Sequence, residues 1–298
     1  MRSEKTWSTP VIDEEKKPVP CTLCGNQVFK PSLSCEGFSY VRCTRCGLVQ
    51  INPQPLEEEI KRRYGERSGE DYLAYEIANE KAYLNLQLLA LSDTGFEKPE
   101  KELFAKKNEA PRVLDIGCAT GSLLAHLRER GWKTFGVEIS GPQAEYGRRE
   151  RGLDISGLPL QQNHFPAAQF DVILASHLIE HLNDPSALVQ EARRILAPEG
   201  RFFVTTPNIA GLQARLFKSR WRSAIFDHLY LFSVKTLSRL LEQKGFAIEK
   251  KASWGGLAAG SAPAPVKKLF DKAAKRFGFG DVMILRAKCS KISHEVKT

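Results

Sequence analysis

From Arg112 onward, short apolar runs alternate with segments of helical pattern, and this alternation constrains the fold more than any other feature of the chain. The first four runs are RVLDIG, TFGVE, FDVILA and RFFVTT, and amphipathic segments separate them. Two later runs, FAIEKKASW and DVMILRAK, have the composition of further strands. Strands alternating with helices indicate a mostly parallel sheet covered by helices on both faces. We therefore predict a doubly wound α/β sheet of about seven strands.

Polar residues mark the starts of three of the predicted helices. Asp184 directly precedes Pro185, and Ser140 stands two residues before Pro142. Ser233 precedes a third helical pattern that runs to Gln243. A side-chain oxygen at such a position accepts a hydrogen bond from a free amide of the first turn, and proline suits the first turn itself. We expect all three residues to cap their helices.

The segment VLDIGCATGS joins the first predicted strand to the helix after it. Asp115 ends the strand, and Gly117 and Gly121 lie in the turn, where the absence of Cβ atoms lets backbone approach a ligand. The helix that follows presents unpaired amides at its N-terminus. Glu138 ends the next strand, where a carboxylate accepts hydrogen bonds from both hydroxyls of a ribose. This arrangement predicts a nucleotide-binding site at the carboxyl edge of the sheet.

Four of the seven cysteines form two CxxCG knuckles, and no apolar export signal precedes them. Cys21 and Cys24 make the first knuckle, and Cys43 and Cys46 make the second. This spacing is typical of a zinc ribbon, in which four thiolates close a tetrahedron and leave no open position. We predict one structural zinc ion bound by these cysteines and a segment too short to fold without it.

The segments quoted above resemble the class I S-adenosylmethionine-dependent methyltransferases, and within them the small-molecule and sugar methyltransferases. Asp115, Gly117, Gly121 and Glu138 match the first motif and the acid that follows it, whereas Ala119 stands where the family usually has glycine. FDVILASHLIEHLNDPSALVQEARRILAPEGRFFVTTPN and DHLYLFSVKTLSRLLEQKGF extend the likeness over most of the C-terminal two-thirds. The resemblance implies a Rossmann-like methyltransferase sheet. It implies cofactor contacts at Asp115, Gly117, Cys118, Ala119, Gly121, Glu138, Ile139, Ala175, Ser176 and His177.

Three histidines are candidate catalytic residues, because an imidazole titrates in the range that suits removal of a proton from an acceptor hydroxyl. They are His177, His181 and His228. Glu180 and His181 have an alternative role as ligands of a divalent ion, as in related families with Glu-x-x-Glu-His. The remaining alternative for each is a structural hydrogen bond.

The chain divides into four parts on composition. Residues 1–20 form a flexible lead, 21–52 the zinc ribbon, 53–110 a helical connector or lid, and 111–298 the methyltransferase domain. The connector carries apolar and aromatic residues at helical spacing, which we expect to pack on the core or cover the ligand cleft. These residues are Ile60, Tyr64, Tyr72, Tyr75, Leu84 and Leu88.

The net charge of +9 is concentrated at the C-terminal end of the chain. From Ala264 onward there are nine Lys and Arg against three Asp and Glu, which gives +6 of the +9. Within it, residues 265–279 form a basic amphipathic segment whose apolar stripe we expect to pack on the core; contact with an anionic membrane surface is the alternative. No apolar stretch approaches the length of a membrane-spanning helix, so we expect a cytoplasmic protein, or one peripheral to the inner face of the membrane.

Three functions remain open from the sequence. The first is S-adenosylmethionine-dependent methyl transfer to a small-molecule or glycan acceptor, including a nucleotide sugar or a surface polysaccharide. The second is RNA methylation, with the ribbon, Arg42, Arg45 and the KRRYGER stretch as phosphate contacts. The third is a non-enzymatic zinc-ribbon binding protein with a degenerate cofactor fold. Intact Asp115 and Glu138 count against the third, and the absence of an NPPY-type motif counts against the second.

Overall fold

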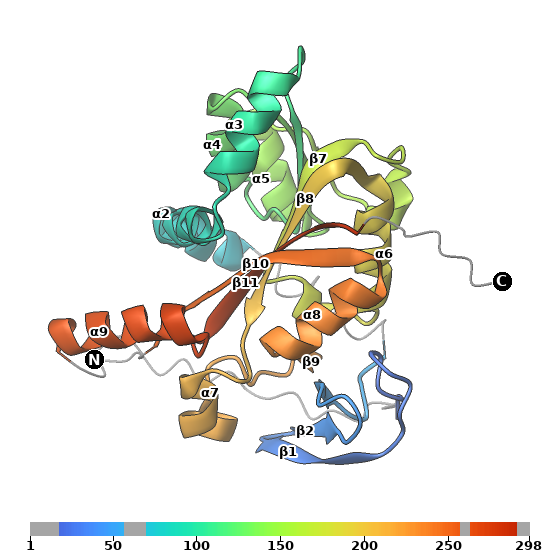
Figure 1. The fold of residues 1–298 in the computed structure, drawn as a ribbon, viewed down its shortest axis with the longest axis vertical. Coiled ribbons are helices and arrows are strands. Elements are labelled where there is room, and N and C mark those ends of the chain that lie inside the picture. Colours follow the sequence, from blue (N-terminus) through green and yellow to red (C-terminus); the bar gives the residue numbers. More distant parts are fainter. Residues whose placement is uncertain (1–17, 57–69, 257–262, 291–298) are drawn as a thin grey trace.

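The computed structural model describes residues 18–56, 70–256 and 263–290. The strands of its central sheet are β4 (Arg112–Ile116), β5 (Lys133–Val137), β6 (Ile155–Ser156), β7 (Phe170–Ser176), β8 (Leu196–Pro207), β10 (Phe246–Trp254) and β11 (Val282–Cys289). They lie in the order β10-β11-β8-β7-β4-β5-β6 (Figure 1). The strands from β8 to β6 are parallel, and β11 is antiparallel to both of its neighbours. The expected mostly parallel seven-stranded α/β sheet is confirmed.

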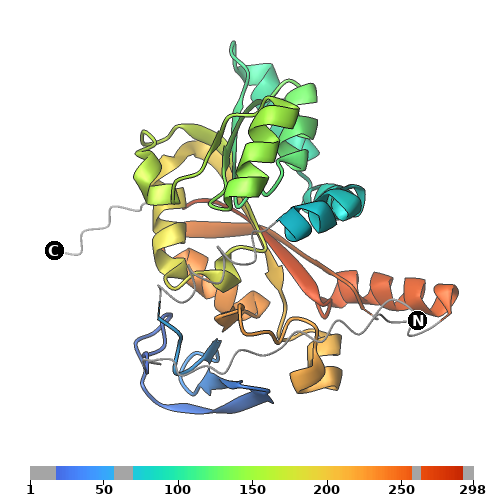
Figure 2. The ribbon, with the colours of Figure 1, turned by 180° about the vertical axis from the view of Figure 1, so that it is seen from behind.

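Helices cover both faces of this sheet (Figures 1 and 2). The helices of the described residues, of which α9 projects away from the sheet, are α2 (Glu70–Asp93), α3 (Glu97–Lys106), α4 (Ser122–Glu129), α5 (Gly141–Arg151), α6 (Pro185–Ile195), α7 (Leu212–Phe217), α8 (Val234–Gln243) and α9 (Ala264–Phe277). In β7 the side chains of Val172 and Leu174 pack with α2 and α4, whereas Ile173 and Ala175 pack with α6 and α8. Alternate residues of a strand point to opposite faces, so a strand buried on both faces reads as an unbroken apolar run.

Two of the three expected helix caps are confirmed, and the third is wrong. The Asp184 carboxylate accepts from the amides of Ser186 and Ala187, and Ser233 forms a capping box with Thr236. Ser140 accepts no capping bond; its hydroxyl donates to the Gln143 side chain, and its amide donates to Glu138. Ser140 stands at the N-cap position of α5, but its hydroxyl is engaged with the Gln143 side chain instead of a first-turn amide.

The cysteine-rich segment forms a second sheet together with a strand from the catalytic part of the chain. Its strands are β1 (Phe29–Cys35), β2 (Phe38–Cys43), β3 (Val49–Ile51) and β9 (Tyr230–Leu231), in that order and antiparallel throughout. The buried residues of the ribbon and of the α6 and α8 side of the sheet form one continuous core. The ribbon is therefore stabilised by packing on the larger domain as well as by its own cysteines.

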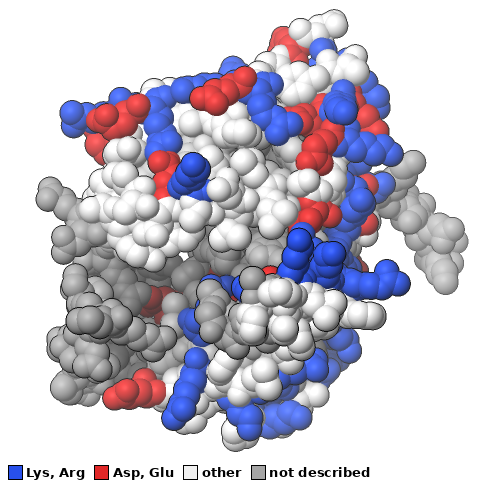
Figure 3. All heavy atoms as spheres, turned by 90° about the vertical axis from the view of Figure 1, so that its left-hand side faces the viewer, with Lys and Arg blue, Asp and Glu red and all other residues white. Residues whose placement is uncertain are grey.

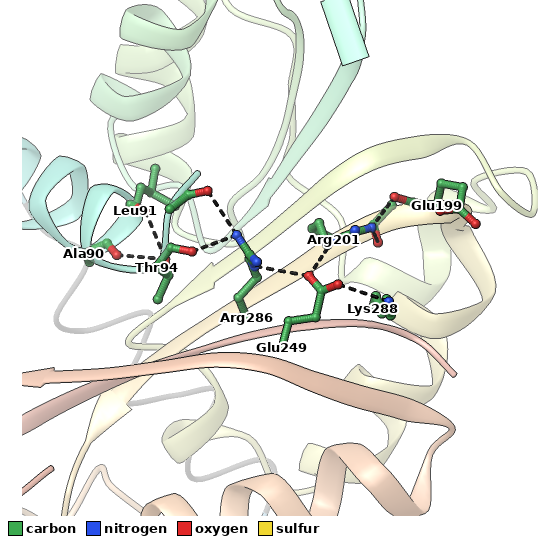
Figure 4. Close-up of polar contacts among 10 residues, drawn as sticks. Ala90, Leu91, Thr94, Glu199, Arg201, Glu249, Arg286 and Lys288 are labelled. Atoms are coloured by element: carbon green, nitrogen blue, oxygen red, sulfur yellow. Dashed lines mark hydrogen bonds and ion pairs between the residues drawn. The ribbon is translucent and has the colours of Figure 1, made fainter. Parts of the chain in front are cut away.

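Helix α2 crosses the edge of the central sheet, and its C-terminal end is attached there. The guanidinium of Arg286 on β11 donates to the carbonyl oxygens of Thr94 and Gly95, which follow α2 (Figure 4). Arg286, Arg201 and Lys288 all approach the carboxylate of Glu249 on β10. This network joins three strands and α2.

The aromatic residues near the start of α2 do not pack on the core, which leaves the other expected role, covering the ligand cleft, as a prediction. Tyr72 and Tyr75 are exposed and stack on each other, whereas Leu84 and Leu88 do pack on the sheet. Ile60, Tyr64 and the KRRYGER stretch lie outside the described residues.

Helix α9 leaves the body of the molecule, so the prediction that its apolar stripe packs on the core is wrong. The face toward the body carries buried Ala274, together with Asp271, which accepts from the Gly256 amide, and Lys275, which donates to Asp93. The apolar side chains form another face that is open to solvent. These side chains, named here the α9 stripe, are Val266, Leu269, Phe270 and Phe277. The helix projects outward in both ribbon views (Figures 1 and 2).

Candidate active site and metal centre

The glycine-bearing turn lies at the carboxyl edge of the sheet, between β4 and α4. Gly117 and Gly121 have φ angles of +75° and +76°, which residues with a side chain rarely adopt. A Cβ atom on Gly121 would lie 2.4 Å from Leu153 Cδ1, so the turn excludes a larger residue there. Ala119 also has a positive φ, +49°, and holds a strained conformation where the resembling family has glycine.

Glu138 closes this turn against the next strand. Its carboxylate accepts hydrogen bonds from the amides of Ala119, at 3.0 Å, and Ser140, at 2.8 Å. Asp115 is buried, and its Oδ1 atom has no hydrogen-bond partner among the described residues. Burial and then the charge of Glu138 raise the pKa of Asp115 to about 8, and burial raises that of Glu138. Of the two carboxylates, Asp115 is the one with an oxygen that lacks a donor among the described residues.

The other predicted cofactor residues surround the same turn with different exposure. Cys118 is buried beside Gly136, and burial raises the pKa of its thiol. Ile139 is exposed directly after Glu138, which leaves an apolar surface beside the carboxylate. Ala175 and Ser176 end β7, the neighbour of β4 in the sheet. The structure thus brings together all ten residues of this prediction at one edge.

His177, His181 and His228 gather around one buried carboxylate, that of Glu180. The His177 ring nitrogen Nδ1 lies 3.4 Å from Glu180 Oε1, and the rings of His181 and His228 are 4.6 Å apart. Thr206 donates to Glu180 Oε2 at 2.9 Å. Burial opposes ionisation of Glu180, but the His177 hydrogen bond and the nearby imidazoles lower its pKa to about 2.

The three imidazoles differ in access to solvent. His177 is half exposed and has a φ angle of +52°, with its amide held by the carbonyl oxygen of Thr205. His228 is buried, its Nδ1 lies 2.8 Å from the Ser223 carbonyl oxygen, and burial lowers its pKa. Its ring reaches the cluster from a loop remote in sequence. One atom each of Glu180, His181 and His228 lies within 4.8 Å of the others, so a cation fits this group geometrically.

The two cysteine knuckles converge on one point in the ribbon. The Sγ atoms of Cys21 and Cys46 are 3.4 Å apart, those of Cys24 and Cys43 are 3.5 Å apart, and all four lie within 4.8 Å. A tetrahedral zinc site with Zn–S bonds of about 2.3 Å needs sulfur atoms about 3.8 Å apart. The four thiols therefore fit zinc without rearrangement of the backbone. Cys35 lies outside this group.

The model of a methyltransferase domain family matches residues 94–251, more than half of the chain. The chain belongs to this methyltransferase domain family. The match begins at the end of α2 and includes the glycine turn, Glu138 and the Glu180 cluster. The expectation drawn from the sequence motifs is confirmed at the level of the family.

Curated relatives of the methyltransferase domain share only part of their length with it. A ubiquinone biosynthesis O-methyltransferase of Histophilus somni is 29% identical over 133 residues, 41% of this chain and 53% of that protein. One from Idiomarina loihiensis is 32% identical over 113 residues, 36% of this chain and 44% of that protein. The chain spans about half the length of the curated relatives it matches.

A solved structure supports the fold of the methyltransferase domain. Phosphoethanolamine N-methyltransferase 2 of Haemonchus contortus, in complex with S-adenosyl-L-methionine, superposes with a TM-score of 0.56 at 14% identity. The alignment covers 82% of this chain and 63% of that one. At this identity the likeness extends to the fold alone.

Two groups near the site of this methyltransferase domain were missed by sequence analysis. Thr206, at the end of β8, holds Glu180 in place, and Glu76 of α2 lies near Glu138. No motif identifies Glu76, because its segment reads only as an amphipathic helix. Thr206 is in the predicted strand RFFVTT, but its side-chain contact depends on how β8 lies beside the turn after β7.

Proposed function

We propose that this protein transfers the methyl group of S-adenosylmethionine to a small-molecule or glycan acceptor, with a nucleotide sugar or a surface polysaccharide as the preferred class. The observation that carries the proposal is the pair of carboxylates, Asp115 and Glu138, at a glycine turn on the carboxyl edge of the sheet. Membership in the methyltransferase domain family supports it.

The cofactor supplies an activated methyl group on a sulfonium centre. Glu138 would accept a hydrogen bond from a ribose hydroxyl, and its own position is set by the amides of Ala119 and Ser140. Asp115, buried and short of donors, accepts from the methionyl end through the turn at Gly117. Ile139, whose side chain is exposed, would offer the cofactor an apolar surface beside Glu138. The acceptor enters past Ser176 and His177.

His177 is the general base in this proposal. It combines access to solvent with a contact to Glu180, which orients the ring. His181 and His228 hold Glu180 from the other side, and are the alternative bases. His177→Asn is expected to retain cofactor binding and to lower the transfer rate about a hundredfold, the range of a positioned proton acceptor.

The four-cysteine site binds structural zinc and leaves no position open for a substrate. Its role is to support the ribbon sheet, whose last strand, β9, belongs to the catalytic part of the chain. The ribbon then borders the acceptor side of the site through the loop that carries His228.

Peripheral contact with the anionic inner face of a membrane is a second part of the proposal, and the exposed α9 stripe supports it. The helix carries five Lys and Arg beside this stripe, which is the composition of a helix that lies in a lipid interface. Basic side chains border uncharged surface on the side of the molecule where α9 projects (Figure 3). No helix in the described part of the chain has the length and apolar character needed to cross a membrane.

Calorimetric titration with S-adenosylmethionine and S-adenosylhomocysteine tests the proposal. The wild-type protein is expected to bind both, and Glu138→Ala to bind neither measurably. Transfer of a labelled methyl group to nucleotide sugars and, separately, to RNA then identifies the acceptor class. Absence of cofactor binding by folded, zinc-loaded protein would exclude methyl transfer, and methylation of RNA alone would replace the glycan acceptor.

A further inference from the structure

Helix α2 brings a third carboxylate, that of Glu76, to the side of the site where Glu138 lies. Glu76 accepts a hydrogen bond from the Gln143 side chain and lies close enough to Glu138 for their charges to repel. The Ser140 hydroxyl donates to the amide oxygen of Gln143, so the amide nitrogen is left to donate to Glu76. Ser140 in turn donates its backbone amide to Glu138. A short chain of hydrogen bonds thus links the two acids.

The oxygen atoms at this place outnumber the donors. The Oε2 atom of Glu76 is buried and has no hydrogen-bond partner among the described residues, as is also true of Asp115 Oδ1. Burial, and then the charge of Glu138, raise the pKa of Glu76 to about 7. Buried acceptors without donors are rare in folded proteins, because each loses its hydrogen bonds to water. A ligand that brings donors would satisfy both atoms.

The position of Glu76 is fixed by the rest of α2. One turn further along, Glu80 pairs with Arg151 of α5, and beyond it Leu84 and Leu88 pack on the sheet. The far end is attached to β11 through Arg286 (Figure 4). Glu76 is therefore held beside Glu138 by a helix that is anchored at several points.

We propose that Glu76 binds the nucleoside end of the cofactor, accepting a hydrogen bond from a ribose hydroxyl beside Glu138. This inference rests on the proposed function. A ribose presents two hydroxyl donors to an edge where Glu76 and Glu138 present acceptors, and a carboxylate acceptor makes a stronger hydrogen bond than a neutral one. Helix α2 then forms one wall of the cofactor site, although Glu76 precedes the segment that matches the family model.

Titration with two nucleoside ligands tests the assignment. S-adenosylhomocysteine and 5′-methylthioadenosine share the nucleoside, whereas only the first carries the amino-acid group. Glu76→Gln is expected to lower the affinity for both ligands by about tenfold or more, the range for loss of a hydrogen bond to a charged group. Glu80→Gln, one turn away on α2 and paired with Arg151, is the matched control and is expected to change either affinity by less than about threefold.

Thermal unfolding without ligand separates binding from a structural role. The pKa of Glu76 is higher in the folded protein than in the unfolded chain. The free energy of unfolding therefore falls progressively as the pH rises from 4.5 to about 7 and Glu76 ionises. Glu76→Gln removes this cost, and its Tm at pH 8 is expected to equal or exceed that of the wild type. Weaker binding with an unchanged or higher Tm supports the proposal.

Two results would overturn it. One is unchanged affinity of Glu76→Gln for both ligands while the wild type binds them, which refutes the assignment of Glu76 and leaves the proposed function intact. The other is loss of affinity for S-adenosylhomocysteine alone, which moves Glu76 to the amino-acid end. Failure of the wild type to bind either ligand would instead refute the proposed function.

Discussion

The hydroxyl of Tyr40, in the ribbon, lies 2.9 Å from the backbone carbonyl oxygen of His228, in the candidate active site. The same hydroxyl lies 2.7 Å from the carbonyl oxygen of Ile225, so one buried side chain holds both ends of the loop before β9. Burial raises the pKa of Tyr40 and keeps it a donor. The ribbon is thus connected directly to the backbone that carries His228.

Tyr40→Phe removes this hydroxyl and little else. We expect a loss of about 1–3 kcal/mol in the free energy of unfolding, because the carbonyl oxygens of Ile225 and His228 lose the one hydroxyl donor that they share. Urea denaturation measures the change. Tyr83→Phe, which removes an exposed hydroxyl on α2, is the control and is expected to change it by less than about 0.5 kcal/mol. Equal stability of Tyr40→Phe and the wild type would contradict the role of this hydroxyl.

Removal of zinc is expected to reduce the local stability of β9 as well as that of the ribbon. Gln50 and Val49 of β3 pair with Tyr230 and Leu231, so the order of one strand supports the other. Hydrogen exchange at the amides of β9 is expected to accelerate after chelation, whereas exchange in β5 stays unchanged.

Two cysteine variants test whether the four-cysteine cluster binds zinc. Cys24→Ser removes one of the four clustered thiols, while Cys35→Ser changes a cysteine of the ribbon that lies outside the cluster. Atomic absorption is expected to find one zinc ion per chain in the wild type and in Cys35→Ser, and a deficit in Cys24→Ser. Full zinc content in all three proteins would rule out this site.

Binding of the cofactor is expected to release a proton near neutral pH. Burial and the charge of Glu138 raise the pKa of Asp115 to about 8 in the empty site, and a ligand with cationic and donor groups lowers it. Affinity therefore increases as the pH rises toward 8 and levels off above it. Calorimetry in two buffers of different ionisation enthalpy measures the proton, and Asp115→Asn is expected to remove most of the release. A pH-independent affinity in the wild type would contradict the prediction.

The sequence predicted the elements of the domain well because their signals are local. The runs RVLDIG and FDVILA became β4 and β7 because an apolar run flanked by helical patterns has few alternatives in an α/β fold. The four clustered cysteines follow from spacing alone in the same way. Asp184 and Ser233 cap their helices through contacts within three residues.

The remaining features depend on contacts between distant segments. No local pattern shows that Tyr230 and Leu231 complete the ribbon sheet, or that His228 faces Glu180 from 48 residues away. The α9 stripe faces solvent because Asp271 and Lys275 bind the body instead. In each case a tertiary contact decided between options that the local sequence left open.

The exposed α9 stripe predicts binding to vesicles that contain anionic lipid. The protein is expected to stay in solution when phosphatidylcholine vesicles are sedimented. It is expected to co-sediment with vesicles that also contain phosphatidylglycerol, and less so at high salt. Leu269→Glu is expected to abolish binding, because Leu269 is 66% exposed at the centre of the stripe. Lys272→Gln removes one basic charge and is expected to weaken it about fivefold. Val28→Glu, at an exposed apolar residue of the ribbon, is the control.

Equal binding of Leu269→Glu and the wild type to the vesicles would refute a lipid contact through α9. Concentration-dependent dimerisation that is lost in Leu269→Glu would assign the stripe to a second copy of the chain.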